Sequence, residues 1–67
     1  MKEIDARGLS CPEPIMLTSE AIKENDGPVK VIVNEPHQKT NIETFAKRRG
    51  KKTTSKEVGS DIEIIIE

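Results

Sequence analysis

Residues 8–14 read Gly-Leu-Ser-Cys-Pro-Glu-Pro, and this stretch decides how the amino-terminal part of the chain folds. Proline is tolerated in the first turn of a helix, because the N–H group that it lacks would have no partner inside the helix. The stretch therefore predicts a turn over residues 7–10 and a helix over residues 11–25, with Gly27 as its stop. At about 100° per residue, the inner side of this helix is expected to carry Pro14, Ile15, Leu17, Thr18, Ala21 and Ile22.

Hydrophobic periodicity outside this helix predicts the other elements. Valines at every second position favour a strand that ends before Glu35-Pro36, since proline cannot donate to a sheet ladder. A stripe of Ile42, Phe45 and Ala46 favours a second helix, closed by Gly50. The further predicted elements are a strand over 2–6, a strand over 29–34, a helix over 38–49, a polar edge strand over 51–58 and a strand over 61–67.

The predicted order is β-α-β-α-β-β. A right-handed crossover through the first helix would make the first two strands parallel neighbours. Each helix has one apolar side, so both are expected to cover the same face of the sheet. The predicted fold class is therefore α+β: a two-layer α/β sandwich with two helices on one face of a four-stranded mixed sheet, in a single domain over residues 1–67. Only 33% of the residues are hydrophobic, and Phe45 is the sole aromatic, which leaves no room for a buried cofactor.

Charge and cysteine content narrow the classes of function. The 11 Lys and Arg residues balance 12 Asp and Glu residues, which argues for a soluble protein and against a dedicated nucleic-acid binder. No apolar run reaches the roughly 18 residues of a membrane span, and residues 1–5 do not resemble a signal peptide. The single cysteine cannot form an internal disulfide, so we expect a free thiol and a reducing, cytoplasmic location.

Cys11 has two interpretations. Most free cysteines behave as small buried hydrophobic residues. At the start of a helix, however, the positive end of the helix dipole favours the thiolate, which is the nucleophilic form. Arg7 would add positive charge nearby, and Glu13 would oppose it. The position of Cys11 favours a reactive role.

The same stretch resembles the signature of a known family. Gly8-Leu9, Cys11-Pro12 and Pro14 match the Gly-Leu-x-Cys-Pro-x-Pro pattern of the TusA/SirA/YedF sulfur-carrier family. The chain length and the β-α-β-α-β-β order agree with that family over nearly the whole chain.

The resemblance implies a sulfur relay. The family's signature cysteine accepts sulfane sulfur as a persulfide from a cysteine desulfurase or a rhodanese-like donor, and passes it to a cysteine of an acceptor protein, for instance for tRNA thiolation. That role falls on Cys11, with Pro12 and Pro14 as structural residues. Such a chain is a sulfurtransferase-type carrier that works with partner enzymes rather than a complete enzyme. Many members carry Asp-Pro where this chain has Glu35-Pro36, which leaves the partner and the pathway open.

Three residues near the signature are candidates for docking a partner: Arg7, Glu13 and Met16. An exposed methionine beside a reactive cysteine suits an adaptable contact surface. His37 is the only histidine, and one histidine with one cysteine falls short of a metal site, so no metal or other cofactor is expected.

A basic run surrounds Gly50. Positive charge at the carboxyl end of a helix complements the helix dipole, so these residues are first interpreted as a solvated cap. The alternative is a small non-catalytic module that uses the run to bind RNA or a protein. A thiol redox protein is a third hypothesis, weakened by the lack of a resolving cysteine. The basic residues are Lys47, Arg48, Arg49, Lys51 and Lys52.

Overall fold

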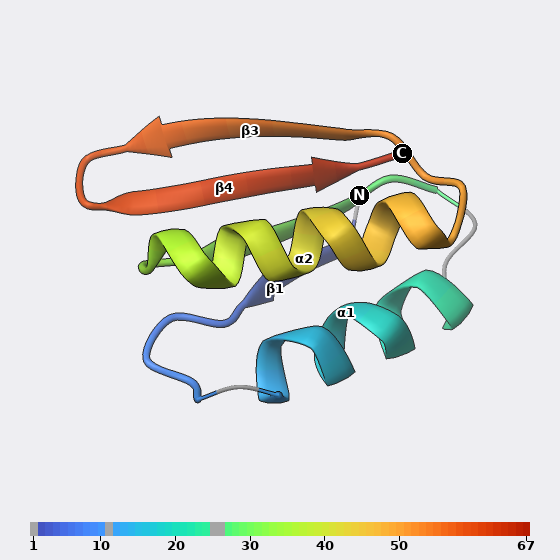
Figure 1. Cartoon of the computed structure of the whole chain (residues 1–67), viewed down its shortest axis with the longest axis horizontal. Helices are drawn as coiled ribbons and strands as arrows, with labels where there is room; N and C mark the ends of the chain where they lie inside the picture. The colour runs from blue at the N-terminus through green and yellow to red at the C-terminus, as the bar shows by residue number, and fades with distance from the viewer. Residues whose placement is uncertain (1, 11, 25–26) are drawn as a thin grey trace.

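The computed structural model describes residues 2–10, 12–24 and 27–67, and it folds as a two-layer α+β sandwich (Figure 1). The elements follow one another in the predicted order β-α-β-α-β-β, and the predicted fold class is confirmed. Their bounds are β1 Lys2–Asp5, α1 Glu13–Glu24, β2 Val29–Val33, α2 Pro36–Arg48, β3 Thr53–Val58 and β4 Asp61–Ile66.

The four strands form one mixed sheet in the order β1-β2-β4-β3. β1 and β2 are parallel neighbours, with Ile4 opposite Val31, as the right-handed crossover through α1 predicted. β4 pairs antiparallel with both β2 and β3. The two most apolar strands therefore occupy the centre, and the polar β3 lies at an edge, where charged side chains discourage pairing with another chain.

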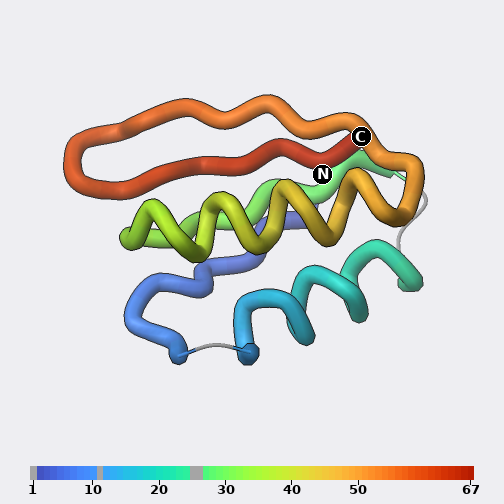
Figure 2. The backbone as a smooth tube through the Cα atoms, viewed as in Figure 1, coloured from blue at the N-terminus to red at the C-terminus, as the bar shows by residue number. Residues whose placement is uncertain are grey.

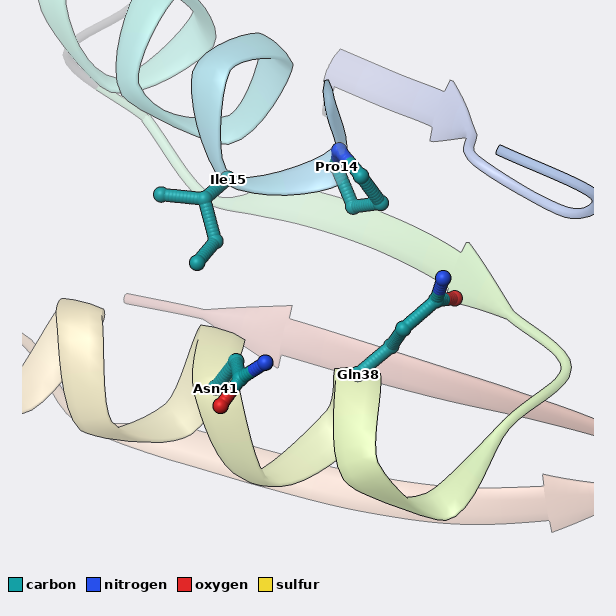
Figure 3. Close-up of a pocket in the computed structure, with 4 residues that line it drawn as sticks. All are labelled: Pro14, Ile15, Gln38 and Asn41. Carbon is teal, nitrogen blue, oxygen red and sulfur yellow. The ribbon is translucent and has the colours of Figure 1, made fainter. Parts of the chain in front are cut away.

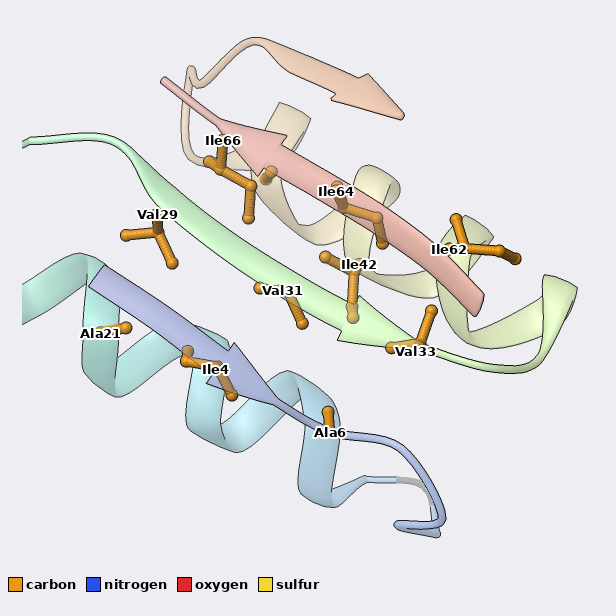
Figure 4. Close-up of a cluster of buried hydrophobic side chains, with 11 residues drawn as sticks. Ile4, Ala6, Ala21, Val29, Val31, Val33, Ile42, Ile62, Ile64 and Ile66 are labelled. Carbon is orange, nitrogen blue, oxygen red and sulfur yellow. The ribbon is translucent and has the colours of Figure 1, made fainter. Parts of the chain in front are cut away.

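Both helices cover one face of the sheet, and the core lies between the two layers (Figure 4). Every second residue of the central strands points into it, because successive side chains of a strand point to opposite faces. Burying each of these Val or Ile side chains is worth about 1.5–3 kcal/mol. The buried side chains of the two central strands are Val29, Val31, Val33, Ile62, Ile64 and Ile66.

Charged side chains form ion pairs on the face of the sheet that the helices do not cover. Lys30, on β2, lies 3.2 Å from the carboxylate of Glu63 on β4 and 3.8 Å from that of Glu3 on β1. These pairs link three neighbouring strands across the open face.

β1, β2, α2 and β4 each end one residue earlier than predicted, and the boundaries differ from the predictions at three further places. The predicted ends of the first helix, Cys11 and Asn25, lie outside the described residues, and α1 covers Glu13–Glu24 within them. The predicted start of the second helix at Gln38 is wrong: α2 begins two residues earlier, because Pro36 has a φ angle already suited to the first helical turn. β3 begins at Thr53 instead of residue 51, although Lys52 still exchanges backbone hydrogen bonds with Glu67.

Four predicted inward-facing residues are less buried than expected, and two of them, Ile15 and Ile22, are partly buried against the core. Leu17 is 37% exposed, although it was predicted on the inner side of α1. Phe45 is only half-buried, and the guanidinium carbon of Arg49 lies 4.9 Å from its ring centroid. The residues of α1 that are fully buried are Pro14, Thr18 and Ala21.

Candidate functional site

The candidate site lies where the chain leaves β1 and turns into α1 (Figure 2). The carboxyl ends of parallel strands are where α/β folds usually place their ligands. Here the carboxyl end of β1 leads directly into residues 6–10. The amino ends of α1 and α2 lie at this same end of the molecule (Figure 1). Two positive helix ends therefore face the same region.

Gly8 makes the turn between β1 and α1 possible. Its φ angle is +77°, in the left-handed region that residues with a Cβ atom rarely adopt. Its N–H lies 3.4 Å from the side-chain oxygen of Asn34, which follows β2. Leu9 N–H donates to the carbonyl of Ala6 at 3.3 Å, so the turn is closed by its own backbone.

The start of α1 is built around two prolines. Glu13 N–H donates to the carbonyl of Ser10 at 2.8 Å, and Met16 N–H donates to the carbonyl of Pro12 at 3.0 Å. Pro14 is buried, and its carbonyl accepts a 2.8 Å hydrogen bond from the Thr18 hydroxyl. Proline has no N–H to leave unsatisfied there, which suits it to the first turn.

Cys11, the predicted sulfur-bearing residue, lies outside the described residues. Its two neighbours, Ser10 and Pro12, are both exposed. Ser10 and Pro12 thus lie at the surface, close to the first turn of α1.

Gln38 is a residue of this region that the sequence analysis missed. It is only 4% exposed, and its side-chain Nε2 donates a 2.6 Å hydrogen bond to the carbonyl of Leu9. Together with Pro14, Ile15 and Asn41 it lines a small hollow between the two helices (Figure 3). The i, i+4, i+8 spacing of Gln38, Ile42 and Ala46 was the available signal, because it places Gln38 on the buried stripe of α2.

The three candidate docking residues have different surroundings. The guanidinium of Arg7 pairs with the carboxylates of Asp5 at 2.7 Å and Asp61 at 3.0 Å. The side-chain hydrogen bond from Arg7 is the main reason that the pKa of Asp5 is lowered to about 2, and the same bond raises the pKa of Arg7. Glu13 is exposed, and Met16 is 57% exposed.

The basic run lies at the other end of α2, far from the start of α1 (Figure 1). A helix of 13 residues is about 20 Å long at 1.5 Å per residue. Within the described ranges, none of the five basic side chains forms an ion pair. The structure therefore does not bring this run together with the signature stretch.

His37 pairs with its neighbour Glu35, with 3.2 Å between Nδ1 and a carboxylate oxygen, and both side chains are exposed. Across residues 2–10, 12–24 and 27–67, no group of three or more potential metal ligands occurs. No helix in that same part of the chain is both long and apolar enough to cross a membrane.

Comparisons with known proteins agree with this geometry. A segment of 44 residues is 39% identical to the "Sulfur carrier protein TusA" of Pseudomonas entomophila; it spans 63% of this chain but only 55% of that protein, about half its length. The crystal structure of a SirA-like protein from Desulfitobacterium hafniense superposes with a TM-score of 0.93 at 28% identity, covering 98% of this chain and 95% of that one. The family model described as "Sulfurtransferase TusA" matches residues 2–67. The predicted resemblance is confirmed, and the chain belongs to the TusA family.

Proposed function

We propose that this chain is a sulfur carrier that holds sulfane sulfur as a persulfide on Cys11. The observation that carries the proposal is the family match over residues 2–67, which includes the whole Gly8 to Pro14 signature. The geometry around position 11 supports it, since exposed neighbours and the amino end of α1 suit an accessible and nucleophilic thiolate. A reducing, cytoplasmic location and a single domain over residues 1–67 belong to the same proposal.

The proposed chemistry consists of two sulfur transfers. In the first, the Cys11 thiolate attacks the outer sulfur of a donor persulfide, the bond between the donor's two sulfurs breaks, and the donor leaves as a thiolate with the electron pair. In the second, a thiolate of the acceptor protein attacks the outer sulfur on Cys11, and the Cys11 thiolate is released. Neither step needs an external oxidant or reductant, because one sulfur–sulfur bond replaces another.

The partners that fit this chemistry are a persulfide-forming donor, such as a cysteine desulfurase or a rhodanese-like protein, and an acceptor with a reactive cysteine. Glu13 and Met16 lie on exposed positions of the first turn of α1, where an incoming partner would meet them. Arg7 is already engaged by two carboxylates, so its part in docking would require a partner that competes for those pairs.

The test is an intact-mass measurement. The purified chain is incubated with a cysteine desulfurase and free cysteine, and its mass is recorded without reductant. We expect a gain of one sulfur atom that reductant removes and that Cys11→Ala lacks. If several unrelated donors give no gain while Cys11 still alkylates readily, the carrier function is refuted.

A further inference from the structure

Gln38 places a polar side chain inside a layer whose other buried residues, apart from Thr18, are apolar among the described residues. It occupies the same stripe of α2 as Ile42 and Ala46, and it is 4% exposed. Buried polar groups are nearly always fully hydrogen-bonded, and an exception needs a physical explanation. Gln38 is such an exception, because its Oε1 has no hydrogen-bond partner among the described residues.

The other half of the carboxamide makes a strong contact with the signature stretch. Nε2 donates to the carbonyl of Leu9 at 2.6 Å, across 29 residues of sequence. The hydrogen bond from the neighbouring Gly8 N–H to the Asn34 side chain is longer, at 3.4 Å. Of the hydrogen bonds that Gly8 and Leu9 make with side chains of distant residues, the one from Gln38 is therefore the shorter.

The Gln38 carboxamide contributes little net free energy to the stability of the fold. The net gain from one hydrogen bond is similar to, or smaller than, the cost of burying one unpaired acceptor. A methionine, of similar length and without polar atoms, would avoid that cost. What only the carboxamide supplies is a defined position for the Leu9 carbonyl, two residues before Cys11.

We infer that Gln38 is a positioning residue that holds the chain leading into Cys11 against the amino ends of α1 and α2. This inference rests on the proposed function, in which Cys11 must be presented as a thiolate. With the Leu9 carbonyl fixed, the chain that leads towards the first turn of α1 keeps one position, and the positive end of that helix favours a thiolate placed beside it. Without that contact, the turn keeps its own backbone hydrogen bond and the bonds of Gly8 and Arg7, but it loses its hydrogen bond to α2.

The test compares Gln38→Met with Asn41→Ala. Asn41 lies one turn further along α2 and lines the same hollow (Figure 3), but no hydrogen bond joins it to Leu9 within the described ranges. Three quantities are measured: the midpoint of thermal unfolding, the pH profile of Cys11 alkylation by iodoacetamide, and the amide NMR signal of Ser10. That amide belongs to the peptide group whose carbonyl Gln38 binds, so its signal reports the contact directly.

For Gln38→Met we expect an unfolding midpoint that is unchanged or higher. The alkylation profile should shift to higher pH by about half a unit, the size of a typical interaction between a charge and a helix end. The Ser10 signal should move, and sulfur loading should slow severalfold. Asn41→Ala should leave the alkylation profile and the Ser10 signal in place.

An alkylation profile of Gln38→Met that superimposes on that of the unaltered chain overturns the inference. If Gln38→Met is poorly folded, Gln38→Leu takes its place, at a temperature well below its unfolding midpoint. Its alkylation profile is then compared with that of the unaltered chain. Alkylation needs no sulfur donor, so it tests Gln38 independently of the carrier function. If the Gln38→Met profile shifts but the unaltered chain never gains sulfur, the positioning role stands and the carrier function is rejected. If the unaltered chain gains sulfur but the Gln38→Met profile does not shift, the carrier function stands and the positioning role is rejected.

Discussion

The guanidinium of Arg7 joins two carboxylates that come from opposite ends of the chain. It binds both oxygens of Asp5, through Nε at 2.8 Å and Nη2 at 2.7 Å, and reaches Asp61 through Nη1 at 3.0 Å. The bidentate geometry favours the ionised form of Asp5 and lowers its pKa to about 2. Both groups are about half exposed, so dissolved salt will weaken the pair.

Replacing Arg7 with Gln should return the pKa of Asp5 towards its ordinary value of 3.8. Because the folded-state pKa of Asp5 is depressed, its contribution to stability is present above pH 3.8 and is lost as the pH falls through about 2. The stability of the Arg7→Gln variant should therefore lack the loss that Asp5 causes at acid pH in the unaltered chain. Carboxyl NMR titration measures the pKa, and unfolding midpoints between those pH values measure the linked stability.

Asp61→Asn is the matched control for Arg7→Gln, because it removes the weaker partner and keeps the bidentate pair with Asp5. The Asp5 pKa should stay well below 3.8 in this variant. A normal Asp5 pKa in the unaltered chain would show that the pair does not form in solution.

Contacts between side chains that are distant in sequence could not be predicted from the sequence. Arg7 was expected to lend charge to Cys11, yet its partner Asp61 lies 54 residues away. The bond from Gln38 to Leu9 spans 29 residues and depends on how α2 packs beside α1. Local patterns do predict the signature turn itself, because glycine and proline act through their own backbone geometry. The role of Cys11 remains a prediction.

The signature stretch and the basic run lie at opposite ends of the two-layer fold. The amino ends of both helices and the carboxyl end of β1 meet near residues 8–14 (Figure 1). The basic residues of the last turn of α2, Lys47 and Arg48, lie about 20 Å away along the helix. Positive charge there complements the negative end of the helix dipole.

Replacing both Lys47 and Arg48 by Gln should distinguish a structural role of the basic run from a binding role. As a helix cap, each charge contributes about 0.3–1 kcal/mol to stability at low salt. The double variant should therefore unfold at slightly lower temperature, while sulfur loading from a donor stays the same because Cys11 lies at the other end. Thermal unfolding at low and high salt, with the mass-based loading assay, gives both values.

The matched control is Lys23→Gln, which removes a positive charge from the last turn of α1. It should show a stability loss of the same kind with loading again unchanged. Loading that fails only in the Lys47 and Arg48 variant would mean that the donor docks on the basic run. Loss of RNA binding in that variant, with no sulfur gain in the unaltered chain, would favour the binding-module alternative.

Periodicity predicted the elements that bury one regular face. The alternation in β2 and β4 matches their buried residues, and the polar β3 lies at an edge as expected. Periodicity could not predict how far neighbouring elements cover the two sides of a helix. Leu17 is therefore more exposed than predicted, whereas Ile15, which lines the hollow beside α2, packs against the core.

The molecule as a whole depends on a thin core. One layer of side chains separates the helices from the sheet (Figure 4). The opposite face of the sheet carries ion pairs and no second layer of described residues. A chain of 67 residues has a total stability of about 3–10 kcal/mol, at about 0.05–0.15 kcal/mol per residue. One large cavity would remove much of that.

Ile64 and Ile65 form a matched pair for testing this dependence. They are neighbours on β4, but Ile64 is fully buried in the core and Ile65 is half-buried on the open face. Ile64→Ala should cost about 2–5 kcal/mol, because the cavity adds to the lost burial. Ile65→Ala should cost about 1 kcal/mol or less, mainly through weaker strand propensity. Urea unfolding measures both values, and equal losses would mean that the open face is covered in solution, for instance by a second copy of the chain.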